Sequence, residues 1–254
     1  MTAVKLSTQQ PVPPARRDSL RQTVRQTYAR AASEAAAPGC RDLACTPYSG
    51  LGCGSPTAFA GLAAGEWVLD LGCGAGFDCL AAAVEVGSGG RVVGIDMTPE
   101  MVRLARRHAA DAGVAIVSFL QGEIESLPFR DASFDVVMSN CVINLCAEKE
   151  RIFAEAWRVL KPNGRLAVAD IVAVAPLPAP VLADLSSHTG CVAGATPMQA
   201  LSPMLRRAGF AAEKIDIGEH SATLIDAWAP DLDLQRFVAA AHITARKPAG
   251  AACK

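Results

Sequence analysis

The chain has 254 residues, of which 51% are hydrophobic, and its 24 basic and 25 acidic residues give a formal net charge of −1. This near-neutral charge provides no field that would gather nucleic acid or an anionic membrane surface, so we expect neither as a partner. No apolar run reaches the ~18 residues of a membrane helix, and the N-terminus lacks a secretory signal, so we predict a cytoplasmic protein with one main α/β domain.

The N-terminal residues 1–38 are predicted to form a disordered tail followed by a helix. Leu20, Val24 and Tyr28 recur at helical spacing within residues 18–37, and Pro38 with Gly39 ends the pattern. Residues 40–55 are rich in Gly, Pro and Cys, which is typical of a loop. A further helix is predicted over residues 56–64.

From residue 67 onward, apolar strand-like runs alternate with helical patterns. The runs expected to be strands are 67–72, 91–97, 114–122, 134–140, 164–172, 211–219 and 236–248, and the expected helices are 77–86, 99–112, 147–160 and 197–210. This alternation predicts a parallel sheet with helices on both faces, within one domain over residues 39–250. Prolines interrupt it after residue 172, where we expect a long loop over 172–196.

A glycine-rich turn in "VLDLGCGAGFDC" follows the first of these strands, with glycines at 72, 74 and 76. Such a turn lets ligand atoms approach the main chain, and Asp96, twenty residues after Gly76, is placed to accept hydrogens from two ribose hydroxyls. A dinucleotide site would need G-x-G-x-x-G for its phosphates, whereas this spacing is G-x-G-x-G. Asp70 suits a cationic amino group better than a phosphate. The turn is similar to that of class I S-adenosylmethionine methyltransferases.

The nine cysteines are odd in number and scattered, which favours reduced thiols over a disulfide framework. They form no C-x-x-C pairs of the kind that structural zinc ribbons use. Cys53 and Cys191 stand beside glycines in predicted loops, and Cys141 follows a strand at the sheet edge where α/β proteins bind ligands. These three differ from Cys73 and Cys79, which we interpret as packing residues, while Cys146 remains open.

Soft thiolates select soft, thiophilic atoms, and none of the four histidines has ligand spacing to a cysteine pair. An all-sulfur site is therefore favoured over a mixed zinc site. A trivalent metalloid such as arsenic(III) takes three thiolates and keeps a lone pair that can act as a nucleophile.

Five segments, "LGCGSP", "GIDMTPEMV", "GEIESLPF", "SNCVINL" and "GCVAGA", resemble the arsenite S-adenosylmethionine methyltransferases over about residues 40–210. The resemblance implies a Rossmann-like class I methyltransferase fold, with a mostly parallel seven-stranded sheet. It implies that Cys141 and Cys191 hold arsenite or methylarsenite, that Cys53 joins them in the first round, and that Cys40 or Cys45 takes part as the N-terminal thiol. A thioredoxin or glutathione reductant is also implied.

The glycine turn and the family resemblance also indicate which residues would bind S-adenosylmethionine. Gly72, Gly74 and Gly76 would shape the turn under the methionine part of S-adenosylmethionine, Asp70 would attract its amino group and Asp96 its ribose. The residues expected at the adenine ring or the methyl channel are Met97, Glu123 or Glu125, Ile124 and Asn140. Asn144 is predicted to cap a helix. The alternatives are another small-molecule C- or N-methyltransferase, a non-catalytic metalloid-binding protein and, more distantly, a dinucleotide oxidoreductase.

Overall fold

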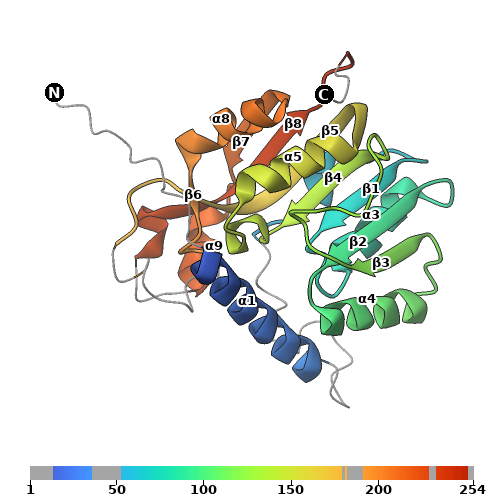
Figure 1. Cartoon of the computed structure of the whole chain (residues 1–254), viewed down its shortest axis with the longest axis horizontal. Coiled ribbons are helices and arrows are strands. Elements are labelled where there is room, and N and C mark those ends of the chain that lie inside the picture. The colour runs from blue at the N-terminus through green and yellow to red at the C-terminus, as the bar shows by residue number, and fades with distance from the viewer. Residues whose placement is uncertain (1–13, 36–52, 179–180, 182–190, 229–232, 251–254) are drawn as a thin grey trace.

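The computed structural model describes residues 14–35, 53–178, 181, 191–228 and 233–250 (Figure 1). The predictions for the tail before residue 14, for Cys40 and Cys45, and for most of the loops at 40–55 and 172–196 lie outside these residues. All other expectations can be compared with the described part of the chain.

The fold is built on one sheet whose main strands follow the order β3-β2-β1-β4-β5-β8-β7. Strands β1 to β5 run parallel, and β8 is antiparallel to both β5 and β7. The strands are β1 Trp67–Leu71, β2 Arg91–Asp96, β3 Val117–Gln121, β4 Phe134–Asn140, β5 Leu160–Ala173, β6 Thr196–Pro197, β7 Ala211–Ile217 and β8 Val238–Arg246. The seven predicted strands form this path, and the two-residue β6, which was not predicted, adds an eighth strand beside β5.

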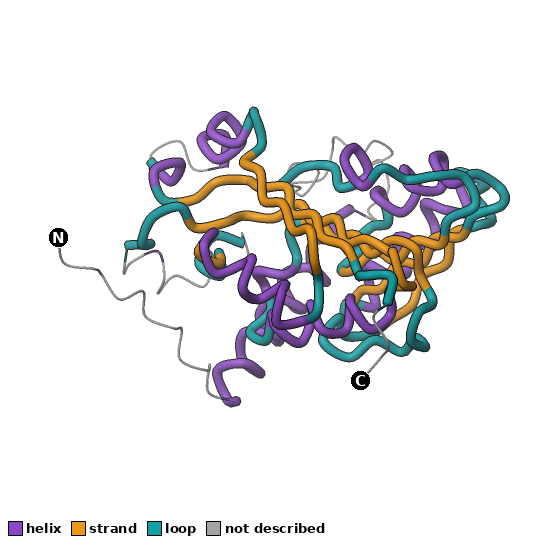
Figure 2. The backbone as a smooth tube through the Cα atoms, turned by 90° about the horizontal axis from the view of Figure 1, so that it is seen from above, coloured by secondary structure: helices purple, strands orange, loops and turns teal. Residues whose placement is uncertain are grey.

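Helices cover both faces of the sheet, as Figure 2 shows from above. They are α1 Pro14–Ala35, α2 Thr57–Ala60, α3 Phe77–Val86, α4 Pro99–Asp111, α5 Lys149–Val159, α8 Met198–Ala208 and α9 Ser221–Trp228, with short 3₁₀ helices η2 Ile143–Leu145 and η3 Leu234–Arg236. The central strands are buried on both sides, which explains their continuous apolar runs. In the described part of the chain, no helix combines the length and apolar character needed to cross a bilayer.

Three elements differ from the sequence prediction. The helix expected over residues 56–64 stops at Ala60, because Gly61 takes a left-handed backbone (φ 60°, ψ 48°) that ends it. Helix α9, between β7 and β8, was not predicted, although its buried Ile225 packs near the ends of the strands. Strand β5 runs to Ala173, two residues into the loop expected at 172–196.

The topology explains where a ligand could bind. The chain moves outward from β1 to β3 on one side, then returns to place β4 on the other side of β1. The loops that follow β1 and β4 therefore diverge and leave a crevice at the carboxyl ends of these strands, as in other open α/β sheets. A separate cluster of buried residues lies at this end, and it contains Cys53, Cys141 and Cys191.

Candidate active site at the carboxyl ends of the strands

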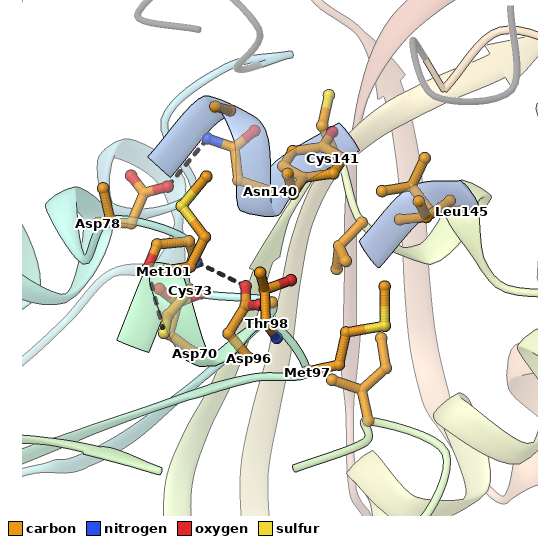
Figure 3. Close-up of a pocket in the computed structure, with 18 of the residues that line it drawn as sticks. Asp70, Cys73, Asp78, Asp96, Met97, Thr98, Met101, Asn140, Cys141 and Leu145 are labelled. Carbon is orange, nitrogen blue, oxygen red and sulfur yellow. Dashed lines mark hydrogen bonds between the residues drawn. The ribbon is translucent and has the colours of Figure 1, made fainter. Parts of the chain in front are cut away.

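A cavity of about 810 Å³ lies at the carboxyl edge of β1, β2 and β4. Figure 3 shows Asp70, Asp96, Met97, Asn140 and Cys141 around it. Every residue predicted to bind the cofactor, except Gly76, is among its lining residues: Asp70, Gly72, Gly74, Asp96, Met97, Glu123, Ile124 and Asn140. Residues from four separate segments of the sequence thus face one space.

The glycine turn has positive φ at all three predicted glycines. A Cβ on Gly72 would lie 2.5 Å from Val142 Cγ2, and one on Gly76 would lie 2.7 Å from the Phe119 ring. These two glycines are therefore required by close packing as well as by their backbone angles. Gly74 has no atom within 4 Å of such a Cβ, so its backbone borders open space on the cavity side.

Asp96 is held rigidly at the end of β2. Its Oδ2 accepts a hydrogen bond from Gly74 N (2.9 Å) and its Oδ1 accepts one from Thr98 N (2.8 Å). Burial raises the pKa of this carboxyl above its ordinary value. Each oxygen keeps a second lone pair, so the fixed carboxylate could accept a pair of hydroxyl hydrogens from a ribose in the cavity.

Asp70 is a buried carboxyl at the floor of the same cavity, with 2% of its surface exposed. The Cys79 thiol donates to its Oδ2 (3.2 Å). Burial and the nearby Asp78 carboxyl raise the pKa of Asp70 well above its ordinary value. A cationic group in the cavity would offset both effects, because an opposite charge favours the ionised carboxylate. The amino group of a methionine moiety has that charge.

The adenine side of the predicted site is closed by helix α1, which the sequence reading had treated as a separate segment. Arg21 of α1 pairs with Glu125 (3.1 Å) and with Glu123 (3.5 Å), and Arg17 pairs with Glu148 (2.6 Å). The helix packs on α4 in Figure 1 and presents an apolar face to the cavity. That face consists of Leu20, Val24, Tyr28 and Ala31. The helical spacing of these residues could be seen in the sequence, but the position of the helix beside the cavity could not.

Asn140 lines the cavity, yet its amide is bound to the chain itself. Its Oδ1 accepts from Cys53 N (3.1 Å), and its Nδ2 donates to Gly54 O (2.7 Å) and to Asp78 Oδ2 (2.9 Å). The contact with the cofactor stays a prediction. The side chain joins the segment that carries Cys53 to the strand that carries Cys141, a role that the sequence did not indicate.

The three predicted thiols lie together. Cys53 and Cys141 form a disulfide with their Cα atoms 5.8 Å apart, and the Cys191 thiol donates to the Cys141 carbonyl oxygen at 2.8 Å. The expectation of reduced cysteines is therefore wrong for one pair in this structure. Cys141 lines the cofactor cavity, whereas Cys53 and Cys191 lie behind it in an apolar cluster of the described chain.

Cys141 and Cys191 share an unusual backbone. Both have positive φ, 53° and 65°, a conformation that non-glycine residues seldom adopt. In Cys141 this turn comes directly after β4, so the side chain leaves the alternating pattern of the strand and faces the site. Such conformations cluster at functional sites because the surrounding structure must hold them in place.

A buried polar network supports these two cysteines. Asn144 was predicted to cap a helix, which is wrong: its Nδ2 donates to Asp170 Oδ1 (2.8 Å) and to Ile171 O (2.5 Å) inside the fold. Lys149 donates from Nζ to Gly194 O (2.9 Å) and so binds the segment after Cys191 to the start of α5. Burial raises the pKa of Asp170 to about 6 and lowers that of Lys149.

The remaining described cysteines have clear positions. Cys73 and Cys79 are buried in the core under the glycine turn, as expected for packing residues, and Cys79 also bonds Asp70. Cys146 lines the cofactor cavity at the end of η2. Burial, together with the nearby Glu125 carboxylate, raises the pKa of the Cys146 thiol well above its ordinary value.

Comparison with known proteins identifies the family of the chain. Residues 62–209 match a family model described as a methyltransferase domain. An arsenite methyltransferase of Halobacterium salinarum is 52% identical over 200 residues, which cover 79% of this chain and 51% of that protein. The arsenite methyltransferase of Homo sapiens is 37% identical over 153 residues, covering 57% of this chain and 41% of that protein. The chain thus spans about half the length of the curated relatives it matches.

The fold agrees as well. The crystal structure of an arsenic(III) S-adenosylmethionine methyltransferase from Chlamydomonas reinhardtii matches with a TM-score of 0.63 and 35% identity, covering 88% of this chain and 74% of that one. Together with the glycine turn, Asp96 and the three assembled cysteines, these likenesses show that the chain has the class I methyltransferase fold and belongs to the arsenite S-adenosylmethionine methyltransferase family.

Proposed function

We propose that this protein moves the methyl group of S-adenosylmethionine onto trivalent arsenic held by the thiolates of Cys53, Cys141 and Cys191, in the service of arsenic detoxification. The observation that carries the proposal is the placement of Cys141. Its side chain lines the same cavity as Asp96, while its disulfide and its carbonyl bring Cys53 and Cys191 to the same point.

The cavity has the features that S-adenosylmethionine would need. Asp96 would bind the ribose hydroxyls, Asp70 would attract the amino group, and Gly74 leaves room for the methionine part. Met97 and Ile124 offer apolar surface for adenine, with Glu123 at the rim. When bound there, S-adenosylmethionine supplies an electrophilic sulfonium methyl group.

Arsenite binding would begin with reduction of the Cys53–Cys141 disulfide. An external dithiol, of the thioredoxin type, or glutathione would donate two electrons and two protons and leave two thiols. Each of three thiols then replaces one hydroxyl of arsenous acid, and each hydroxyl leaves as water with the thiol proton. The reducing cytoplasm would suit this requirement.

The arsenic bound in this way keeps a lone pair and carries no proton. No general base is then needed for methyl transfer, since the nucleophile carries no proton. The arsenic–carbon bond would form as the methyl–sulfur bond breaks, S-adenosylhomocysteine would leave with the electron pair of that bond, and arsenic would be formally oxidised by two electrons. The contribution of the protein is to hold arsenic beside the donor in attack geometry, which can lower a barrier by ~7–11 kcal/mol. The left-handed turns at Cys141 and Cys191 and the buried network behind them provide that rigidity.

The test is to incubate purified, reduced protein with arsenite, a thiol reductant and S-adenosylmethionine, and to separate the arsenic species. We expect methylated arsenic from the wild type and none from Cys141→Ser or Cys191→Ser. Cys253→Ser, at a cysteine to which the proposal gives no role, serves as the matched control. Thiol-dependent arsenite binding without methylated product would instead indicate a metalloid-binding protein. Full activity of the two serine variants on an organic acceptor would indicate another small-molecule methyltransferase.

A further inference from the structure

The thiol site contains a ligand that trivalent arsenic does not use. Asp170 lies near the end of β5. One of its carboxylate oxygens and the sulfur atoms of Cys53 and Cys141 all lie within 4.8 Å of one another. All three residues are buried. Arsenic bound by three thiolates has its lone pair in the fourth direction, so the proposed arsenite chemistry leaves this carboxylate unused.

We propose that the reduced site also binds a divalent thiophilic cation, of the Zn²⁺ or Cd²⁺ class, through the thiolates of Cys53, Cys141 and Cys191 and the carboxylate of Asp170. Borderline-soft dications of this class take four ligands in a tetrahedron and accept a carboxylate oxygen beside thiolates. The site would then bind arsenic(III) with three ligands and a divalent cation with four.

The spacing of the ligand atoms suits such an ion. A tetrahedral site with metal–sulfur bonds of ~2.3 Å places its sulfur atoms about 3.7 Å from one another. The two sulfurs are bonded to each other in this structure, so they reach that spacing only after the disulfide is reduced, whereas the Asp170 oxygen already lies within 4.8 Å of both. Cys191 lies next to this group, since its thiol donates to the Cys141 carbonyl oxygen at 2.8 Å, and in the proposed site it turns to the cation as the fourth ligand once the disulfide is reduced.

Asp170 is held in place as metal-binding carboxylates usually are. Its Oδ1 accepts from Ile171 N (2.8 Å) and from Asn144 Nδ2 (2.8 Å), and its Oδ2 accepts from Asn144 N (3.3 Å). Outer hydrogen bonds of this kind orient ligands and sustain metal affinity. They occupy both lone pairs of Oδ1 and one of Oδ2, so Oδ2 keeps the lone pair that can face the cation.

The charges of the proposed site also balance well. Three thiolates and one carboxylate carry four negative charges, of which a dication neutralises two. The Lys149 ammonium group lies close enough to act electrostatically on both Asp170 and Cys191, and it offsets a third. Without a cation, so many buried anions would repel one another, and the thiols would stay protonated.

Cadmium alone is the probe for the test. Reduced wild-type protein is titrated with Cd²⁺ and followed by the thiolate-to-cadmium charge-transfer absorption. We expect one ion per chain, and we expect X-ray absorption of the loaded protein to show three sulfurs and one oxygen. Asp170→Asn should weaken Cd²⁺ binding at least ~10- to 100-fold, the range typical of disturbed ligand shells. Asp135→Asn, an aspartate at the other end of neighbouring β4, should bind Cd²⁺ as the wild type does.

Two results would overturn the proposal: equal Cd²⁺ affinity in Asp170→Asn and wild type, or a loaded wild-type site without an oxygen ligand. The second measurement uses the wild type alone, so it tests the proposal even if Asp170→Asn does not fold. The inference that arsenite does not use Asp170 as a ligand rests on the proposed function, and it predicts that Asp170→Asn weakens arsenite binding by a smaller factor than it weakens Cd²⁺ binding. A wild type that binds Cd²⁺ through Asp170 but never methylates arsenite would refute the proposed function and leave this inference standing.

Discussion

Lys149 is expected to hold the Cys191 segment in place, and Lys149→Met should release it. Its Nζ donates to Gly194 O at 2.9 Å inside the fold. Gly194 itself lies so close to Asn144 that a Cβ there would overlap the Asn144 carbonyl. The segment that carries Cys191 therefore packs closely against η2, and the Lys149 ammonium group holds it there by a hydrogen bond.

The size of the effect can be worked from this bond. Replacing Lys149 by methionine removes the donor and leaves the partly buried Gly194 carbonyl without this partner, which costs up to ~1–3 kcal/mol. If the segment opens to water to satisfy that carbonyl, its opening equilibrium increases by roughly 5- to 150-fold. The Cys191 thiol, only 3% exposed in the closed state, would react with alkylating reagents faster by the same factor.

The assay is the rate of native-state alkylation by iodoacetamide, resolved for each cysteine by mass spectrometry of peptides. Lys149→Arg, which keeps a donor, should restore most of the protection, and Lys214→Met, at an exposed lysine on β7, should change nothing. Cys79, fully buried in the core, reports global unfolding in the same sample. An unchanged Cys191 rate in Lys149→Met would refute the reasoning, as would an equal rise at Cys79.

Three further predictions concern the cofactor cavity and the buried carboxyl. Gly76→Ala should lower the melting temperature and weaken S-adenosylmethionine binding in calorimetry, since left-handed backbone costs an L-residue ~1–2 kcal/mol and the Cβ would meet Phe119; wild-type values for both would contradict it. Arg21→Ala should weaken S-adenosylmethionine binding and also lower stability by ~1–3 kcal/mol, because it leaves the buried Glu125 carboxylate without its partner, and the swap of Arg21→Glu with Glu125→Arg should recover part of the affinity. Burial raises the pKa of Asp170 from 3.8 to about 6, so the fold favours the protonated carboxyl and its contribution to stability is lost as the pH rises from about 4 past 6. Urea titrations should show that this decline, about 3 kcal/mol, is absent from Asp170→Asn; parallel pH curves for the two proteins would exclude the assignment.

Much of the fold and the cofactor turn could be predicted because their signals are local. A parallel strand buried on both faces needs a continuous apolar run, and the turn after β1 needs glycine where φ is positive and neighbours are close. Asp96 could be found for the same reason, since it ends a recognisable strand at a fixed distance from that turn.

The thiols were only partly predictable. Their glycine-rich surroundings marked Cys53 and Cys191 as unusual, and the resemblance to a family joined them to Cys141. Neither signal showed that Cys53 and Cys141 would form a disulfide, or that Asn140 would bind the backbone of the Cys53 segment. These are pairings between residues more than eighty positions apart, and no local pattern encodes them.

What the amino-acid sequence determined by itself is where the chain turns and which segments pack in the core: the glycine turn and the alternating elements, with the cysteines marked as candidates for chemistry. The tertiary structure alone decided which of these residues contact one another. Pairing of β4 with β5 sets Asn140 opposite Ala169, which brings Cys141 beside Asp170, and packing of α1 on α4 turns an ordinary amphipathic helix into a wall of the cavity. The physical reason is that strand order and register follow from burial of the whole core, so partners distant in sequence are chosen by the fold rather than by their neighbours.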